Sequence, residues 1–552
     1  MEKLKVMFEN GTEIQVEKGT KFHHIVSEYN EKNNAPVVLG CFNGKIVELT
    51  EEINNNGEFT PIDITSEIGM KTYERTLQFI FIKAALDLFK DSKVTIEHTI
   101  SKGLFGELHK EKPLTKEDIT KIKNKMKEII NDDIPINKIV VKKEEAINIF
   151  KSYGMEDKVS LLKYVENDCL KLYELQGQYD YFYGMMAPST GNLNIFDLMY
   201  YKPGFIIKYP ENKRPFKLKK FKDQKKLSKI FIETENWGNI LEVGEVGSLN
   251  DKVTGGESFD IIRVSEAFHE KKIANIADMV LKKKGAKVVL ISGPSSSGKT
   301  TFARRLGIQL RVNGKIPVPI SLDDYFVDRE HTPKDENGDY DFESIYALDL
   351  ELFNNNLKDL MSGKEVKLPI FDFKTGSRSF NVKHTKLPQN GILIIEGIHG
   401  LNELLTSSIA KENKFKIYIS ALTQLNLDNH NRIATTDVRK IRRIVRDFLS
   451  RGYSAEDTLK MWPSIRRGEE KNIFVFQEEA DAMFNSALAY ELCVLKKFAM
   501  LELVKIDEKS PVYEEAQKLM SFLEFFVDID GRLVPDNSIL REFIGGSCFY
   551  EY

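Results

Sequence analysis

The chain has 552 residues, of which 41% are hydrophobic and 30% are charged, and its formal net charge is −3. This length exceeds what one hydrophobic core organises, so the sequence predicts a soluble globular protein of three or more domains. The near balance of charge excludes an overall basic field, and nucleic acid is therefore not indicated as the main partner.

The cysteines and the apolar runs predict the compartment. Cys41, Cys169, Cys493 and Cys548 lie far apart and form neither a CxxC pair nor a disulfide framework, so we expect a reducing cytoplasm. The opening MEKLKVMFENGTEIQV lacks the apolar core of a signal peptide, and TLQFIFIKAALDLF is too short to span a bilayer. We expect no membrane partner.

The first part of the chain mixes β-like and helical patterns. Short β-like runs broken at NGT and NGK predict tight hairpin turns before about residue 65. An amphipathic helix is predicted from Tyr73 to about Phe89. A second helix is predicted in TKEDITKIKNKMKEIINDD, where Thr115 is the expected N-cap.

Residues 205–255 are interpreted as a connector with some strand, because VGSLNDKVTGGESFD has the Gly, Ser and Asn content of a loop. The next stretch, SFDIIRVSEAFHEKKIANIADMVLKKKG, predicts a helix. Strand and helix signals then alternate to about residue 507, with KVVLIS, IPVPISL, GILIIEGI and FKIYIS as the strands. This alternation predicts an α/β fold, a parallel sheet with helices on both faces.

The segment VVLISGPSSSGKTTFARRL carries the full GxxxxGK[ST] pattern between an apolar strand and a helix. Its glycines let the backbone curl so that N–H groups point at phosphate oxygens, and the helix adds its positive N-terminal end. Lys299 is expected to reach the β- and γ-phosphates, and Thr300 to offer its hydroxyl to Mg²⁺. The predicted ATP-binding residues are Gly293, Ser295, Ser296, Ser297, Gly298, Lys299, Thr300 and Thr301.

Acidic residues end two of the predicted strands. Asp323 and Asp324 follow the strand that ends in SLDDYF, at the edge where ligands bind in open α/β sheets. A carboxylate there is able to accept a proton from an attacking hydroxyl, but an Asp pair that caps the next turn fits equally well. Glu396 ends the strand in GILIIEGIHGL and is placed to hold Mg²⁺, whereas His399 is interpreted as a packing or capping residue.

The segment DVRKIRRIVRDFLSRG carries Arg439, Arg442, Arg443, Arg446 and Arg451. The first, third and fourth of these share one helical face by their i, i+4 and i+7 spacing. An arginine face is able to close over a transferring phosphoryl group and neutralise the charge that develops there. A solvated helix face is the alternative, and the phosphate loop in the same domain favours the functional interpretation.

Taken together, residues from about 287 to 507 resemble the uridine kinase and phosphoribulokinase group of P-loop kinases. The pieces GPSSSGKTT, SLDDYF, YDFESIYALD, LPIFDFKTGSR, LIIEGIH and RKIRRIVRDFLSRG occur in the order that this family has. The resemblance implies transfer of a phosphoryl group from ATP, with Mg²⁺, to the 5′-hydroxyl of a nucleoside.

The resemblance also implies roles for single residues. Asp323 becomes the base that takes the hydroxyl proton, Glu343 a ligand of the ribose, and Glu396 a ligand of Mg²⁺ together with Thr300. The implied catalytic residues are Asp323, Lys299, Arg443 and Arg446. The implied substrate-binding residues are Glu343, Phe371, Arg378, Arg443 and Tyr453.

The part of the family site that reads the base differs in this sequence. Uridine kinases read the pyrimidine through a Tyr, a His and an Arg, and these positions match Phe371, Gly376 and Tyr453 here. A site that loses such polar groups loses orders of magnitude in discrimination. We therefore expect a nucleoside or a similar ribose-bearing acceptor that need not be uridine. A kinase of another hydroxyl metabolite and a nucleotide-dependent RNA-binding or regulatory protein stay as alternatives.

Residues 1 to about 200 resemble the N-terminal half of threonyl-tRNA synthetase, through HTISKGLFGELH, KEEAINIF and GMMAPSTGNL. The HxxxH pair of that family's editing domain aligns with Arg75 and Phe79, and its Cys and His align with Phe182 and Met186. None of these side chains can perform the original acid–base or metal chemistry. We therefore expect a retired editing fold, used for binding or for placing the kinase domain, with RNA as the less favoured ligand.

These resemblances predict a chain of five parts, and association into an oligomer is left open. The C-terminal tail NSILREFIGGSCFYEY is apolar enough to dock on another surface. The predicted parts are a TGS-like β-grasp domain at 1–66, a degenerate editing-like α+β domain at 67–204, a connector at 205–255, a P-loop kinase domain at 256–510 and a C-terminal extension at 511–552.

Overall fold

The computed structural model describes residues 2–29, 35–335, 338, 340–372, 375–423 and 425–550. The chain forms two compact units. The first unit comprises Met1–Gln224 and Asn426–Arg432, and the second unit comprises Lys225–Leu425 and Ile433–Tyr552. The boundaries of the five predicted parts stay a prediction. Among the helices of the described residues, none has both the length and the mean hydropathy that are needed to cross a bilayer.

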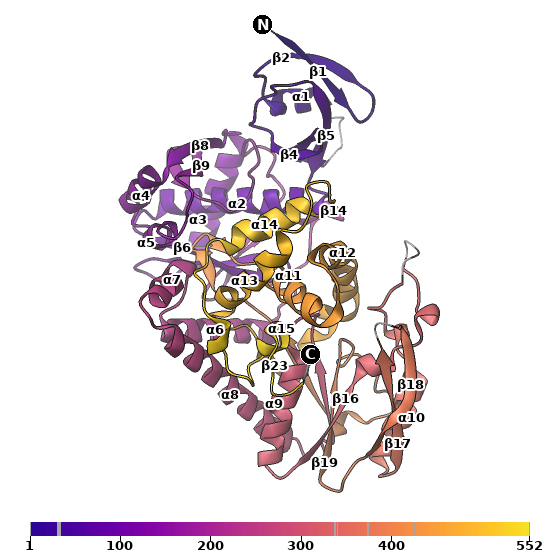
Figure 1. Cartoon of the computed structure of the whole chain (residues 1–552). Helices are drawn as coiled ribbons and strands as arrows, with labels where there is room; N and C mark the ends of the chain where they lie inside the picture. The colour runs from indigo at the N-terminus through magenta and orange to yellow at the C-terminus, as the bar shows by residue number, and fades with distance from the viewer. Residues whose placement is uncertain are drawn as a thin grey trace. The chain divides into compact units, whose positions relative to one another are not determined.

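The first unit begins with a mixed five-stranded sheet in the order β2-β1-β5-β3-β4 (Figure 1). Strands β1 and β5 pair in parallel, and the other neighbours pair antiparallel. Phe22 and Ile25 of helix α1 share a core with Val6 and Phe59 of the sheet, which gives the expected β-grasp arrangement. The bounds are β1 (Lys3–Phe8), β2 (Glu13–Glu17), α1 (Phe22–Tyr29), β3 (Val37–Phe42), β4 (Lys45–Glu48) and β5 (Gly57–Asp63).

The rest of the first unit is α+β, as predicted. It contains a four-stranded antiparallel sheet in the order β11-β12-β7-β6 and a three-stranded sheet in the order β10-β9-β8. Leu77, Phe79 and Phe81 of the long helix α2 are fully buried in its core. The bounds are α2 (Glu67–Leu88), β6 (Lys93–Ile100), β7 (Gly103–His109), α3 (Lys116–Asn131), β8 (Asn137–Lys142), α4 (Lys143–Ser152), α5 (Glu156–Leu162), β9 (Cys169–Leu175), β10 (Gln178–Asp180), β11 (Asp197–Tyr201), β12 (Gly204–Lys208), β13 (Pro210–Glu211) and β14 (Arg214–Leu218).

Two helix ends show where prediction from neighbouring residues succeeded and where it failed. The N-cap at Thr115 is confirmed, because its Oγ1 accepts a hydrogen bond from Asp118 N at 3.1 Å. The loop predicted in VGSLNDKVTGGESFD is wrong, since helix α7 (Val246–Thr254) occupies most of it. Val246 and Leu249 are fully buried on one face of that helix, and their burial outweighs the local preference of Gly, Ser and Asn for turns.

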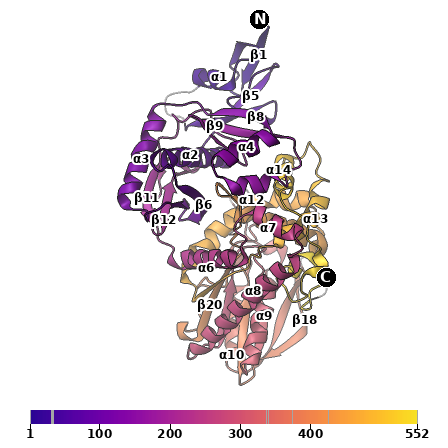
Figure 2. The same cartoon turned by 90° about the vertical axis from the view of Figure 1, so that its left-hand side faces the viewer.

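The second unit is built on a five-stranded sheet in the order β16-β19-β15-β20-β23, in which all neighbours pair in parallel. This confirms the predicted parallel sheet. Helix α9 packs on β16 and β19 and lies beside α8 (Figure 2). The bounds are α6 (Lys225–Leu241), α8 (Ser258–Lys282), β15 (Val288–Ser292), α9 (Lys299–Val312), β16 (Ile316–Ser321), α10 (Leu350–Met361), β17 (Glu365–Asp372), β18 (Ser377–Lys386), β19 (Gly391–Glu396), β20 (Lys414–Ser420) and β23 (Ala482–Asn485).

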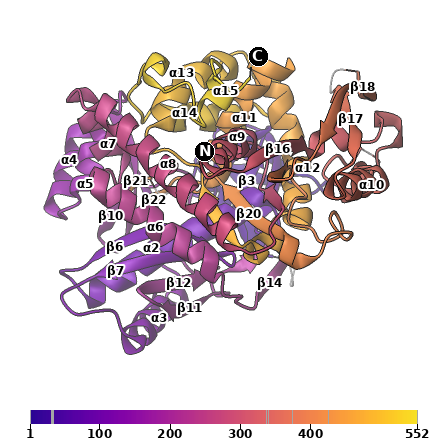
Figure 3. The same ribbon diagram turned by 90° about the horizontal axis from the view of Figure 1, so that it is seen from below.

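A second group of helices completes this unit. Helix α11 packs against α12, α13 and α15, and α14 packs on α13 (Figure 3). Helix α15 belongs to the apolar tail that the sequence described only as able to dock. The bounds are α11 (Thr435–Arg446), α12 (Ala455–Asn472), α13 (Glu491–Leu503), α14 (Tyr513–Leu523) and α15 (Arg541–Ile544).

Candidate active site

The GPSSSGKT loop joins β15 to α9, and its backbone is strongly curled. Ser296 has φ +59° and Gly298 has φ +81°, a left-handed region that glycine enters without strain. Gly293 is required for another reason, since a Cβ there would lie 2.0 Å from the carbonyl oxygen of Ile419. Lys299 is the first residue of α9, so the loop surrounds the positive end of that helix.

Polar groups of this loop fit a phosphate ligand. The hydroxyls of Ser296 and Ser297 are buried and have no hydrogen-bond partner within the described part of the chain. A buried polar group without a partner costs about 1–3 kcal/mol, so such groups usually serve a ligand. Lys299 Nζ donates to the carbonyl oxygens of Gly293 and Pro294, at 3.1 Å each, and burial lowers the pKa of this amine. Phosphate oxygens would supply both an acceptor and a counter-charge.

Glu396 stands at the carboxyl end of β19, directly beside the loop. Its Oε1 accepts hydrogen bonds from Thr300 Oγ1 at 3.3 Å and from Ser321 Oγ at 3.1 Å. Burial and the charge of Asp323 raise the pKa of this carboxyl to about 7, although Lys299 opposes the shift. A threonine hydroxyl and a carboxylate that share one spot are the oxygen donors that Mg²⁺ takes.

The two neighbouring aspartates have different surroundings. Asp324 Oδ1 accepts a hydrogen bond from the backbone amide of Phe371 at 3.4 Å, so Asp324 holds the end of β17 in place. Asp323 lies on the short 3-10 turn Leu322–Tyr325 that follows β16. Its negative charge contributes to the raised pKa of both Glu343 and Glu396, which places its carboxylate among the charges of the loop. The hydrogen bond of Asp324 is thus a structural contact to β17 and not a cap of the next turn, and the role of Asp323 as the base stays a prediction.

Glu343 is a further acidic group of this cluster. Its Oε2 is buried without a hydrogen-bond partner in the described residues. Burial and the charge of Glu469 raise its pKa to about 7, while Arg443 and Lys299 lower it. A carboxyl in this state is able to accept hydrogen bonds from ligand hydroxyls once it ionises.

Two arginines of the predicted arginine face lie close to the loop. Arg443 Nη1 donates to Ser295 Oγ at 2.6 Å, and its Nε pairs with Asp447 Oδ2 at 3.0 Å. Arg446 pairs with the same carboxylate at 2.6 Å. Burial lowers the pKa of Arg443 to about 10, and the neighbouring cations Arg446 and Arg451 act in the same direction. Crowded cations of this kind gain stability from an incoming anion.

Other arginines of the same helix have a structural role. Arg439 is almost fully buried, forms an ion pair with Glu469, and donates to the carbonyl oxygen of Ser295 at 2.9 Å. Arg442 is fully buried and forms an ion pair with Glu491. The guanidinium of Arg439 is thus committed to Glu469 and to the loop backbone, and the closing role stays a prediction for Arg443 and Arg446.

The residues at the expected base-reading positions are partly engaged elsewhere. Phe371 lies 5.7 Å from the Phe326 ring, measured between centroids. Arg378 Nη1 pairs with Asp349 Oδ2 at 3.0 Å, where Asp349 caps helix α10. Tyr453 follows the left-handed Gly452 and is 40% exposed. The base-reading roles of these residues stay predictions.

His399 fits its interpretation as a packing residue. It is 1% exposed, and burial lowers the pKa of the ring to about 4. The imidazole is therefore neutral at physiological pH.

Two carboxylates that accept hydrogen bonds from the loop were not predicted from the sequence. Glu469 Oε1 accepts a hydrogen bond from Ser295 N at 3.0 Å. Glu542 Oε2 accepts from Thr301 N at 3.2 Å and from Thr301 Oγ1 at 2.8 Å. No local pattern marks either residue, and only the apolar character of the tail indicated that it docks. Its Ile539 lies against Gly298, where a Cβ would be 2.5 Å from Ile539 Cγ2.

In the first unit, the four positions aligned with editing residues do lie together, and they are filled. The rings of Phe79 and Phe182 lie 5.1 Å apart, and Thr76 Oγ1 contacts Met186 Sδ at 4.0 Å. Arg75 Nη1 donates to the carbonyl oxygen of Met185 at 2.6 Å. This interior is packed with rings and a satisfied guanidinium.

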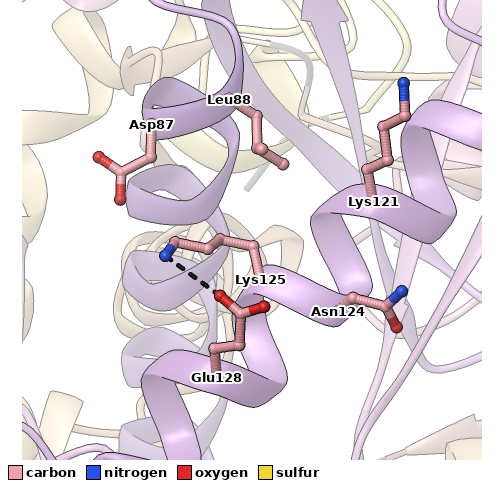
Figure 4. Close-up of a pocket in the computed structure, with 6 residues that line it drawn as sticks. All are labelled: Asp87, Leu88, Lys121, Asn124, Lys125 and Glu128. Carbon is pink, nitrogen blue, oxygen red and sulfur yellow. Dashed lines mark hydrogen bonds and ion pairs between the residues drawn. The ribbon is translucent and has the colours of Figure 1, made fainter.

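A separate hollow of about 550 Å³ lies between α2 and α3 of the first unit. Figure 4 shows Lys125 and Glu128 of α3 directed at each other, and their charged atoms lie 3.2 Å apart. Asp87 and Leu88 line the α2 side. No predicted site residue lies among those that line this hollow.

Residues 288–489 match the model of the Phosphoribulokinase / Uridine kinase family. The second unit carries a P-loop kinase domain of this family. Solved structures similar to the chain include a putative fructose transport system kinase from Silicibacter sp. (17% identity, TM-score 0.27, 38% of this chain and 98% of that chain). A possible uridine kinase from Bacillus stearothermophilus is 22% identical, with TM-score 0.25, and is covered over 39% of this chain and 98% of its own.

The N-terminal region is similar to threonine–tRNA ligases. The ligase of Caldanaerobacter subterraneus is 34% identical over 196 residues, which are 35% of this chain and 30% of that protein. The ligase of Aquifex aeolicus is 32% identical over 202 residues, which are 36% of this chain and 31% of that protein. The chain thus spans about a third of the length of these relatives, and it combines a ligase-like region with a kinase domain.

Proposed function

We propose that the kinase domain transfers the γ-phosphoryl group of ATP to the 5′-hydroxyl of a nucleoside or a similar ribose-bearing acceptor. One observation carries the proposal. Asp323, at the end of β16, lies within the charge cluster of Lys299 and Glu396, beside a loop that holds unpartnered hydroxyls. A carboxylate in that place is able to take a proton from a hydroxyl as the hydroxyl attacks the phosphorus.

The chain's own residues divide the work of the transfer. The loop amides and Lys299 hold the β- and γ-phosphates in line with the acceptor. The acceptor oxygen forms a bond to the γ-phosphorus, the bond from this phosphorus to the bridging oxygen of ADP breaks, and Asp323 receives the hydroxyl proton. Arg443 and Arg446 balance the charge of the transferring group and keep water out.

Thr300 and Glu396 would hold Mg²⁺, because a hydroxyl and a carboxylate oxygen already meet there at 3.3 Å. When bound, the ion neutralises charge on the phosphate oxygens.

The acceptor class follows from the groups beside this cluster. Glu343 offers a buried carboxyl to hydroxyls of a ribose, and Phe371 offers a face for stacking of a base. Gly376 and Tyr453 give no fixed charge or imidazole for the edge of a pyrimidine. We therefore expect weak discrimination between bases.

The test is a panel of acceptors with ATP and Mg²⁺, in which ADP release by the full chain is measured. We expect release that depends on added nucleosides and differs little between pyrimidines and purines. Strong selectivity for uridine and cytidine would contradict the proposed base-reading site. Release with glycerate or a sugar phosphate, and with no nucleoside, would contradict the acceptor class. ATP binding without any acceptor-dependent release would favour the alternative, a nucleotide-dependent RNA-binding or regulatory protein.

A further inference from the structure

A short hairpin of the C-terminal half belongs to the first unit. The chain leaves the second unit after Leu425, forms β21 (Asn426–Asp428) and β22 (Asn431–Arg432), and re-enters the second unit at Ile433. Figure 3 shows β21 and β22 beside α5 and β10. Helix α11, which carries Arg443 and Arg446, begins only two residues after Ile433. The hairpin therefore leads directly into α11, which is called the arginine helix below.

A buried charge cluster holds the hairpin. Lys158 Nζ lies 2.9 Å from Asp180 Oδ1 and 2.8 Å from Asp428 Oδ1, and all three side chains are at most 2% exposed. His430 Nδ1 lies 2.7 Å from Asp180 Oδ2. Burial would lower the pKa of Lys158, but the two carboxylates outweigh burial and raise it, so the ammonium stays charged. Breaking such a buried pair is strongly destabilising, because a charge is left without its partner.

Hydrogen bonds from the retired editing site hold the other side of the hairpin. Asn431 Oδ1 accepts from Tyr183 N at 2.9 Å, and Asn431 Nδ2 donates to the carbonyl oxygen of Tyr181 at 2.8 Å. Gln78 Nε2 donates to the carbonyl oxygen of His430 at 2.5 Å. Gln78 lies on α2 between two of the aligned editing positions, and Tyr181 and Tyr183 flank a third.

We propose that the first unit uses the walls of its retired editing site to anchor the hairpin, and thereby positions the arginine helix of the kinase domain. Asn431, Asp428 and Lys158 are positioning residues, because they act on the transferring group only through Arg443 and Arg446. This inference rests on the proposed function for its kinetic readout and on chain connectivity for its structural readout.

The main test lengthens the link between the hairpin and the helix. A Gly-Gly-Ser insertion between Arg432 and Ile433 leaves every hairpin contact available and removes the positioning. The matched control is the same insertion after Gly363, in an exposed turn at φ +81° that is not part of this connection. A milder variant, Asn431→Ala, deletes the clamp on Tyr181 and Tyr183. Its control is Asn212→Ala, whose side-chain oxygen accepts a local hydrogen bond from the next backbone amide at 2.9 Å.

Three readouts are taken on the full chain at a temperature where circular dichroism shows it folded. We expect the linker insertion to lower kcat about tenfold, to raise the ratio of ATP hydrolysis to transfer, and to leave the Kd for ATP within twofold. Hydrogen exchange at the start of α11 rises in the insertion variant, and Asn431→Ala gives the same changes more weakly. Equal kcat and equal exchange in the linker and control insertions would overturn the inference.

Failure of the proposed function is separable from failure of this inference. If the natural protein shows no transfer to any acceptor, the proposed function is wrong, and exchange of α11 in the free protein still decides the inference. Faster exchange in the linker insertion than in the Gly363 control then supports positioning, and identical exchange overturns it.

Discussion

The loop site of the kinase domain and the ligase-like core around Phe79 and Phe182 of the first unit differ in how their polar groups are satisfied. In the loop site, the hydroxyls of Ser296 and Ser297 and the Oε2 of Glu343 are buried without partners in the described residues. In the editing-like site, Arg75 donates to a backbone carbonyl, and the rings of Phe79 and Phe182 fill the space. The unpartnered groups of the first site lower the stability of the folded protein until a ligand binds them, whereas side chains fill the second site and stabilise it by packing.

Shifted pKa values follow the same division. Burial, and after it the charge of neighbouring acidic groups, raises the pKa of both Glu343 and Glu396 to about 7, as is common in sites that bind cations and phosphates. The loop site thus offers polar groups to a ligand, whereas packed side chains fill the core around Phe79 and Phe182.

The largest effect is expected for Asp323→Asn. Removing the proton acceptor should lower kcat about 10³-fold, because general bases contribute about 10²–10⁴-fold to catalysis. The Kd for ATP, measured by calorimetry, should stay within threefold. The matched control is Asp324→Asn, which keeps the Oδ1 that accepts from Phe371 N and should lose less than tenfold. Equal losses in the two variants would remove Asp323 from the mechanism.

The filled site should respond in stability. Phe79 is fully buried and packs against Phe182, so Phe79→Ala leaves a cavity beside that ring. We expect a loss of about 3–5 kcal/mol in the free energy of unfolding of the first unit, measured by urea titration. Phe216, which is 55% exposed on β14, provides the control Phe216→Ala, for which we expect a change below about 0.5 kcal/mol. A small loss at Phe79 would show that the site is loosely packed and open to a ligand.

The sequence predicted the parts of the fold that depend on neighbouring residues. The GxxxxGK[ST] loop fixes its own backbone through glycines and a helix start, and Thr115 caps its helix through a residue three positions away. The strand ends of Asp323 and Glu396 followed from apolar runs, since parallel strands bring their carboxyl ends to one edge.

Features that depend on distant residues were not predicted. Lys158 and Asp428 are 270 positions apart, and Thr301 and Glu542 are 241 apart, so no local pattern joins them. Helix α7 was missed because its stabilisation comes from buried Val246 and Leu249, while its composition is that of a turn. The ion pair of Arg439 with Glu469 was not predicted either, because spacing gives the helix face but does not reveal Glu469 across it.

The pH dependence of stability tests whether Glu343 of the loop site is buried without a partner. The pKa of Glu343 is about 7 in the folded protein against 4.5 as its ordinary value, so the folded state binds more protons between these pH values. Its contribution to stability is therefore greatest below about pH 4.5 and is lost as the pH rises through 7. Glu343→Gln should be more stable than the natural protein at pH 8, by about 3 kcal/mol, and nearly equal at pH 4.5.

Thermal unfolding of both proteins across pH 4.5–8 measures this difference. Glu351→Gln, on the first turn of α10, controls for loss of a negative charge and should shift little. A stability difference that does not depend on pH would mean that Glu343 is ionised throughout this range.

The smallest expected effect concerns the tail residue that occupies part of the loop. Glu542 accepts from Thr301 N and Oγ1, and Thr301 N is the third amide of α9, where an anion binds well. A phosphate group of the nucleotide and this carboxylate therefore compete for the same donors. Glu542→Gln keeps an oxygen for these bonds and removes the charge, so we expect the Kd for ATP to fall by up to about tenfold, which is about 1.4 kcal/mol. The exposed Glu514→Gln controls for net charge. Weaker ATP binding in Glu542→Gln alone would show that the carboxylate organises the loop for the nucleotide, and the tail would then count as a part of the site.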